Sequence, residues 1–220
     1  MKFFQEITLN FLFSPYIFSI FIGYFIGSFP TAYLLVKRKN DVDIREAGSG
    51  NVGAMNAFEI TNSKTVGVLV MIIDLVKGVA AVLVSLLVFG REPVILSITG
   101  FAAVVGHCYP VWLKFKGGRG LSTAGGVLLV LGWSYVVAWC LLFALIYFSS
   151  KNIHVPNIAA SFLTPVVLAV LPEQILRMTL PSFMGTKEFL YFSIIISCFI
   201  VWRHRESLKD FWKLFRHSTT

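Results

Sequence analysis

The stretch Val66–Phe89, V-G-V-L-V-M-I-I-D-L-V-K-G-V-A-A-V-L-V-S-L-L-V-F, contains only two ionisable residues, Asp74 and Lys77. It is long enough to cross a hydrocarbon core of roughly 30 Å as a helix. Because the two residues are three positions apart, they lie on one helix face. Ionisable groups at membrane depth usually face a polar interior. The stretch therefore predicts a transmembrane helix, in which the pair is either a structural ion pair or one wall of a polar site.

The composition of the whole chain also indicates a membrane protein. Of 220 residues, 56% are hydrophobic and 14% are charged, whereas soluble domains average roughly 45–50% apolar and about 25% charged residues. These values exclude a disordered chain, a coiled coil and a collagen-like fibre, and they argue against an ordinary soluble domain. The three cysteines have no metal or redox spacing, so we expect small buried apolar residues at Cys108, Cys140 and Cys198.

Further apolar runs of bilayer length lie on both sides of the first stretch. The uncharged run Leu121–Phe148 is either one long tilted span or two short helices that turn at Gly132-Trp133-Ser134. The number of spans depends on this run, and the charges of the loops favour two helices. Single spans are predicted at Pro15–Val36, Val94–Leu113, Asn157–Leu171 and Phe189–Trp202.

The chain carries 19 Lys and Arg against 11 Asp and Glu, a net charge of +8. With seven spans, 14 of the 19 basic residues share one side of the membrane, which is the distribution expected of cytoplasmic loops. With six spans, the basic C-terminal cluster would lie on the same side as the N-terminus, against that rule. We therefore predict an all-α polytopic membrane bundle of about seven transmembrane helices, a single domain over residues 1–220, with the N-terminus outside. The 14 residues are Lys37, Arg38, Lys39, Arg45, Lys64, Lys114, Lys116, Arg119, Lys151, Arg203, Arg205, Lys209, Lys213 and Arg216.

Three cytoplasmic loops are unlike ordinary connectors, and the first is Asp43–Glu59, D-I-R-E-A-G-S-G-N-V-G-A-M-N-A-F-E. Its glycines, including Gly48 and Gly50, allow positive φ angles and a close approach of the backbone to a ligand. Successive N–H groups in such a turn form an anion-binding nest. The residues leave two interpretations open, an anion site and a flexible polar loop. Side-chain hydrogen-bonding groups are supplied by Ser49, Asn51 and Asn56.

The second loop is Lys114–Thr123, K-F-K-G-G-R-G-L-S-T, and it ends at the start of an apolar helix. Backbone N–H groups, a helix N-terminus and a fork-shaped cation together favour a phosphate ligand. The order of residues is neither a Walker A loop nor a dinucleotide fingerprint. The alternative is a positive-inside loop with glycine hinges. The candidate phosphate-binding residues are Lys116, Gly117, Gly118, Arg119 and Gly120.

The third segment, Trp202–Lys213, begins where the last predicted span meets the cytoplasm. His204 is a candidate general base near neutral pH, and Glu206 would orient it or a substrate hydroxyl. The alternative is a basic membrane-surface helix anchored by tryptophan. The sequence contains no group with metal-ligand spacing and no base-reading module, so we expect no metal, no cofactor and no nucleic-acid partner.

Together and in this order, the segments resemble the bacterial acyl-phosphate:glycerol-3-phosphate acyltransferases, the PlsY family, over almost the whole chain. The family's first motif, roughly D-I-R-x-x-G-S-G-N-x-G-A-T-N-x-x-R, is similar to Asp43–Glu59. Its D-x-x-K-G is matched by Asp74–Gly78. Its second motif, G-H-x-F-P-x-x-x-x-F-K-G-G-K-G-V-A-T, is similar to Gly106–Thr123, and its third, H-R-E-N-I, to His204–Glu206.

The resemblance implies a seven-span fold in the bacterial inner membrane with a cytoplasmic active site. The implied reaction moves a fatty acyl group from an acyl phosphate to the 1-hydroxyl of sn-glycerol 3-phosphate and yields lysophosphatidic acid and phosphate without a metal. An enzyme that forms the acyl phosphate is then an expected partner. The resemblance places Ser49, Arg119 and His204 at the site.

The resemblance also suggests how the site divides between its substrates. We expect Ser49, Asn51 and the flanking amides to hold one phosphate, and Lys116, Arg119 and the Gly117–Gly120 loop to hold another. His204 and Glu206 would orient or deprotonate the glycerol hydroxyl, with the phosphate of the substrate as an alternative base.

Four positions depart from the family pattern. Glu59 stands where the family has Arg, which exchanges a phosphate-binding cation for an anion. Ser207 replaces Asn, Met55 replaces Thr, and Arg119 replaces Lys. These exchanges leave open a catalytically silent relative that binds lipid or phosphate or supports a membrane assembly, and more weakly a small transporter. The family's Ser-rich segment has three candidate counterparts, Ser149, Ser150 and Ser161.

Overall fold

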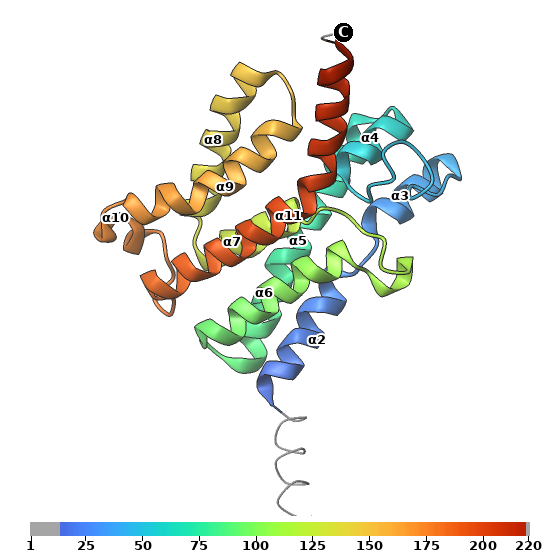
Figure 1. Cartoon of the computed structure of the whole chain (residues 1–220). Coiled ribbons are helices and arrows are strands. Elements are labelled where there is room, and N and C mark those ends of the chain that lie inside the picture. Colours follow the sequence, from blue (N-terminus) through green and yellow to red (C-terminus); the bar gives the residue numbers. More distant parts are fainter. Residues whose placement is uncertain (1–13, 219–220) are drawn as a thin grey trace, which may run out of the picture. The chain divides into compact units, whose positions relative to one another are not determined.

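The structure is a computed structural model that describes residues 14–218, with the side chains of residues 14–205. Every regular element in this range is a helix (Figure 1), which confirms the predicted all-helical fold over the described residues. In chain order the elements are α2 (Pro15–Gly27), α3 (Thr31–Asn40), α4 (Ala54–Thr61), α5 (Lys64–Phe89), α6 (Pro93–Cys108), the 3-10 turn η1 (Val111–Leu113), α7 (Leu121–Leu131), α8 (Ser134–Ser150), α9 (His154–Val170), α10 (Glu173–Met178) and α11 (Thr186–Ser218).

Within the described part of the chain, three segments are long and apolar enough to span a membrane. They are Pro15–Asn40, Lys64–Phe89 and Pro93–Leu113. Shorter apolar helices follow in α7, α8 and α9. The long segments correspond to the first three spans predicted from the sequence.

Helix α5 turns its ionisable residues inward and its large apolar residues outward. Asp74 and Lys77 are 3% and 7% exposed, whereas Leu69, Ile72 and Val76 are 42%, 48% and 51% exposed. This arrangement is unfavourable in water and suits a helix whose outer face contacts lipid. The predicted polar inner face of this helix is therefore confirmed.

Two of the apolar runs are interrupted. Pro15–Val36 was expected as one helix, but α2 ends at Gly27 and α3 begins at Thr31. Pro30 causes the break, because it has no N–H and disfavours the helical conformation of the residue before it. The run Leu121–Phe148 forms the two helices α7 and α8, separated at Gly132-Trp133 as predicted.

The chain folds as two compact units, one that ends at Val130 and one that begins at Leu131. In the first unit α2 lies along α6, and α5 packs against α2, α4 and α6 (Figure 1). A Cβ atom on Gly23 would overlap the carbonyl oxygen of Thr99, and one on Gly27 would overlap that of Ala103. The two glycines thus allow the backbones of α2 and α6 to approach closely, as small residues do in membrane helices.

In the second unit α8 packs against α9, and α11 packs against α9 and α10. In its interior, buried hydroxyl groups pair with each other or with an indole N–H, which satisfies these polar atoms. Side-chain contacts of this kind join Tyr135 Oη to Ser197 Oγ (2.5 Å), Thr179 Oγ1 to Ser134 Oγ (2.9 Å) and Trp139 Nε1 to Ser161 Oγ (3.0 Å).

The three cysteines differ in burial. Cys108 is buried as expected, but Cys140 and Cys198 are exposed. The expectation was wrong for these two residues because each lies on an outward face of its helix, α8 or α11.

Candidate functional site

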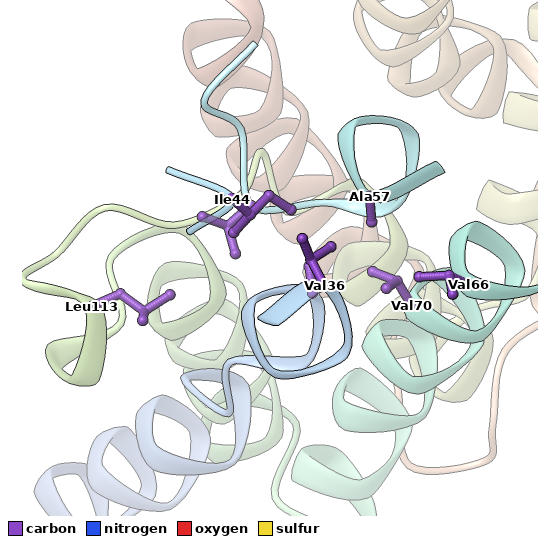
Figure 2. Close-up of a cluster of buried hydrophobic side chains, with 8 residues drawn as sticks. Val36, Ile44, Ala57, Val66, Val70 and Leu113 are labelled. Atoms are coloured by element: carbon purple, nitrogen blue, oxygen red, sulfur yellow. The ribbon is translucent and has the colours of Figure 1, made fainter. Parts of the chain in front are cut away.

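A buried apolar cluster lies beneath both polar loops of the first unit (Figure 2). Ile44 comes from the first loop and Leu113 from η1, directly before the second loop. Both are almost fully buried, at 0% and 3% exposure. The first loop is therefore anchored to the helices by a residue within it, and the second by the residue directly before it. The helices contribute Val36, Ala57, Val66 and Val70.

The first glycine loop is folded around the side chain of Asn56, which is 1% exposed. Its Oδ1 accepts a hydrogen bond from the N–H of Ser49 at 3.0 Å. Its Nδ2 donates to the carbonyl oxygens of Ile44, Ala47 and Asn51 at 3.2, 3.1 and 3.0 Å. Since every polar atom of this amide bonds to loop backbone, Asn56 holds the shape of the loop.

Gly48 and Gly50 adopt the left-handed conformation, with φ angles of 57° and 68°. A Cβ atom on Gly48 would overlap Oδ1 of Asn56, so this glycine is also required for space. The N–H of Gly50 donates to the carbonyl of Ala47 at 3.0 Å. The N–H groups of Ser49 and Gly50 are thus both hydrogen-bonded inside the loop. The exposed side chain of Ser49 and the half-buried side chain of Asn51 remain as donors.

The start of the same loop is fixed by an ion pair between Asp43 and Arg45. Arg45 Nε donates to Asp43 Oδ1 at 2.9 Å, and its Nη1 donates to the carbonyl of Leu113 at 3.3 Å. The guanidinium also lies 5.4 Å from the ring centre of Tyr33. The hydrogen bonds from Arg45 lower the pKa of the Asp43 carboxyl from 3.8 to about 2. Arg45 therefore connects the first loop to the turn that precedes the second.

The second loop lies directly against the end of α6. The N–H of Gly118 donates to the carbonyl of His107 at 3.2 Å. A Cβ atom on Gly118 would overlap Nε2 of His107 and would lie 2.7 Å from the carbonyl oxygen of Val52. The two glycine-rich loops therefore meet at Val52 and Gly118, with the imidazole of His107 beside them.

The other predicted residues of the second loop lie at different depths. Lys116 is exposed, Gly117 and Arg119 are half-buried, and Gly120 is buried with a φ angle of 83°. The carbonyl of Gly120 accepts the first hydrogen bond of α7, from the N–H of Ala124 at 2.8 Å. The predicted arrangement of cations and glycines at a helix N-terminus is therefore present.

A buried polar cluster lies below these loops. Lys77 Nζ is 2.8 Å from Asp74 Oδ1 and donates to the carbonyl of Phe29 at 2.8 Å. His107 Nδ1 is 3.4 Å from Lys77 Nζ and 3.8 Å from Asp74 Oδ1. These residues line a pocket of about 10 Å³, close to the space of one water molecule, together with Thr31. The hydroxyl of Thr31 is buried and makes no hydrogen bond to the described residues.

Sequence reasoning found Asp74 and Lys77 but did not connect them with His107 or with the break between α2 and α3. The available signal was Pro30, which lies inside the apolar run and ends the regular helix before Thr31. No comparable signal in the sequence pointed to Thr31.

The third motif belongs to α11 in the second unit. His204 is 2% exposed, and its Nδ1 is 2.8 Å from the carbonyl oxygen of Ile200, one turn earlier. Since a carbonyl can only accept, Nδ1 carries the proton of this hydrogen bond and Nε2 of the neutral ring has a lone pair. Glu206 and Ser207 lie on α11 as well, and their side chains are outside the described residues.

The fold and the loops define a class, a helical membrane protein in which two glycine-rich loops contact each other. The family model described as glycerol-3-phosphate acyltransferase matches residues 17–214. The chain belongs to the glycerol-3-phosphate acyltransferase family. The resemblance noted in the sequence is therefore confirmed.

Two similar relatives, both named glycerol-3-phosphate acyltransferase, come from Rhodopseudomonas palustris (strain HaA2) and Syntrophotalea carbinolica. The first is 32% identical over 194 residues, with 88% of this chain and 90% of the relative covered. The second is 33% identical over 187 residues, with 85% and 89% covered. Both matches extend over most of each protein.

Two solved structures of PlsY (YgiH), an integral membrane glycerol 3-phosphate acyltransferase, are similar in fold. Its glycerol 3-phosphate form matches with a TM-score of 0.75 and 32% identity, over 91% of this chain and 93% of the other. Its lysophosphatidic acid form matches with a TM-score of 0.74 and 30% identity over the same shares. With the apolar spanning segments, this likeness confirms the predicted helical membrane fold.

Proposed function

We propose that this protein transfers a fatty acyl group from an acyl phosphate to the 1-hydroxyl of sn-glycerol 3-phosphate. The observation that carries the proposal is the contact between the two glycine-rich loops at Val52 and Gly118 in a member of this family. The contact holds the loop of Ser49 and the loop of Lys116 beside each other in the first unit. The solved relatives are described in a glycerol 3-phosphate form and a lysophosphatidic acid form, which are the acceptor and the product of this reaction.

The reaction requires little covalent chemistry from the protein. The glycerol oxygen attacks the acyl carbon and forms an ester bond, while the bond from that carbon to the phosphate oxygen breaks. Phosphate leaves with the electron pair, and the hydroxyl proton passes to a base. Because an acyl phosphate is already activated, the protein mainly positions the hydroxyl and stabilises the charge that develops.

We assign the side chains of Ser49 and Asn51 to one phosphate. The internal hydrogen bonds of Asn56 and of the Gly48–Gly50 turn support this assignment, since they fix the loop without using either side chain. Gly48, Gly50 and Asn56 then act as positioning residues. A hydroxyl and an amide on a rigid loop bind an oxyanion with little loss of conformational freedom.

We assign Lys116, Arg119 and the backbone of Gly117–Gly120 to the second phosphate. The proposal is supported by the exposed ammonium of Lys116 and by the start of α7 at this loop. Cations beside a helix N-terminus stabilise a phosphate dianion.

For the proton we propose His204 as the general base, with Glu206 as its partner or as a ligand of the hydroxyl. The hydrogen bond between Nδ1 and the carbonyl of Ile200 supports this role because it fixes the orientation of the ring on α11. The phosphate of the substrate is the alternative base. A His204→Gln variant that keeps the wild-type pH profile would favour the phosphate.

We further propose that the protein works in the bacterial inner membrane as one multi-pass domain over residues 1–220. An enzyme that forms acyl phosphate then supplies the donor. The apolar spanning segments support a membrane location, and an acyl phosphate is itself an amphiphile that partitions into lipid.

The alternative is a catalytically silent relative, and the position of Glu59 is the observation that favours it. Glu59 is exposed on α4, one turn after the exposed Met55. An anion there would repel a phosphate ligand where the family pattern has a cation.

The test is a synthesis assay with the purified full-length protein, acyl phosphate and labelled glycerol 3-phosphate. We expect labelled lysophosphatidic acid, and a Glu59→Arg variant should bind the acceptor more tightly. The same assay with acyl-CoA should give no product. If neither the wild type nor the Glu59→Arg variant forms product from acyl phosphate, the silent relative is correct.

A further inference from the structure

We propose that Asp74, Lys77 and His107 form a buried positioning cluster that fixes the second glycine loop, so that Lys77 controls affinity for a substrate phosphate that it does not touch. The inference rests on the proposed phosphate-binding role of that loop. It gives a function to Asp74 and Lys77 of α5, two residues that take no direct part in the proposed reaction.

Lys77 joins three segments of the first unit. Its ammonium contacts Asp74 on its own helix at 2.8 Å, the carbonyl of Phe29 at the break between α2 and α3 at 2.8 Å, and His107 on α6 at 3.4 Å. The three ionisable side chains are 3%, 7% and 8% exposed, for Asp74, Lys77 and His107. An ion pair that only neutralised two charges would need no contact beyond the one between Lys77 and Asp74. The other two contacts connect the pair to neighbouring elements.

The contact with Lys77 fixes the state of the imidazole. An ammonium has donors but no lone pair, so Nδ1 of His107 is the acceptor in this contact. The proton of the neutral ring is then on Nε2, on the side of the ring that faces Gly118. The buried pair thus sets both the position of the ring and its tautomer.

The ring in turn supports the second loop from below. The space of a Cβ atom on Gly118 is occupied by Nε2 of His107, and the N–H of Gly118 bonds to the carbonyl of the same residue. A shift of the imidazole must therefore move Gly118 and the neighbouring residues that we assign to phosphate. Such a displacement moves the groups assigned to phosphate away from their ligand and weakens its binding.

The experiment compares Lys77→Met with the double variant Asp74→Asn/Lys77→Met in the purified full-length protein. Lys77→Met alone leaves a buried carboxylate unpaired and should lower the melting temperature. The double variant removes both charges and should recover most of that loss. In the double variant we expect the KM of one phosphate-bearing substrate to rise about tenfold, with the kcat changed much less.

The matched control is the exposed pair of Lys37 and Asp41, which are 2.7 Å apart. The variant Lys37→Met/Asp41→Asn should keep both KM values and kcat. If the Asp74→Asn/Lys77→Met variant is folded and keeps both wild-type KM values, the cluster is only structural and the inference is wrong. A wild-type protein without acyl transfer would instead contradict the proposed function, so the two failures are distinguishable.

Discussion

At the scale of single residues, the side chain of Asn56 makes several of the hydrogen bonds that hold the backbone of the first loop. One buried amide replaces the regular hydrogen bonds that this turn lacks, and it binds four backbone groups between Ile44 and Asn51. Buried backbone groups without partners are costly. The loop that presents Ser49 should therefore lose its shape when the amide is removed.

We predict that Asn56→Ala lowers the free energy of unfolding by about 2–4 kcal/mol, because several buried loop groups lose their partner. Acyl transfer should fall with it. Thermal unfolding of the detergent-solubilised protein measures the change. The control is Asn40→Ala, since Asn40 is exposed and makes one long hydrogen bond of 3.4 Å to the carbonyl of Ile60. Equal melting temperatures for the two variants would contradict the role of Asn56.

The pair of Asp43 and Arg45 gives the first loop a dependence on pH. The pKa of Asp43 is about 2 in the folded protein, below its ordinary value of 3.8. The ion pair therefore contributes stability that is fully present above about pH 4 and is lost as the pH falls toward 2.

We predict that Asp43→Asn lowers stability at pH 7 by about 1 kcal/mol and flattens the dependence on pH between 4 and 2. Unfolding curves measured at pH 7 and at several pH values between 4 and 2 check both expectations. Asp41→Asn is the control, because the carboxylate of Asp41 is 90% exposed and solvent screens its pair with Lys37, so its removal should change the curves much less. A variant at Asp43 with the wild-type slope would show that the pair does not stabilise the loop.

At the scale of elements, the glycines of the second loop and of α7 have different purposes. Gly118 is enclosed by His107 and Val52, whereas a Cβ atom on Gly125 would meet nothing within 4 Å. Gly125 lies inside α7, where alanine is favoured over glycine by roughly 1 kcal/mol.

We predict that Gly118→Ala reduces acyl transfer by about 100-fold, because the loop must shift away from His107. Gly125→Ala should keep activity and raise the melting temperature slightly. Initial rates for the two variants at equal amounts of folded protein make the comparison. Similar activities would mean that the tight fit of Gly118 has no part in catalysis.

The sequence predicted the three long apolar segments and the positions of the glycine-rich loops, but not the contacts within them. The polar face of α5 followed from the spacing of Asp74 and Lys77, and the interruption at Gly132 followed from its position in an overlong apolar run. The break before Thr31 was missed although Pro30 lies there, because the run Pro15–Val36 is long enough to cross the membrane as one helix. The contact of Lys77 with His107 joins residues 30 positions apart, and only the packing of α5 against α6 brings them together.

At the scale of the whole molecule, the loop charges predict which side of the membrane carries the site. The glycine-rich loops and the basic C-terminal segment should be cytoplasmic, with the N-terminus outside. A reporter enzyme fused after Thr220 should be active only in the cytoplasm. An active periplasmic reporter at this position would contradict the predicted orientation.

The central claim is that this chain itself carries out acyl transfer through Ser49. The most direct measurement follows lysophosphatidic acid and inorganic phosphate together when the purified protein is mixed with acyl phosphate and glycerol 3-phosphate. We predict that the two products appear in equal amounts in the wild type and that neither appears with a Ser49→Ala variant of unchanged melting temperature. Full activity of Ser49→Ala, or release of phosphate without lysophosphatidic acid in the wild type, would contradict it.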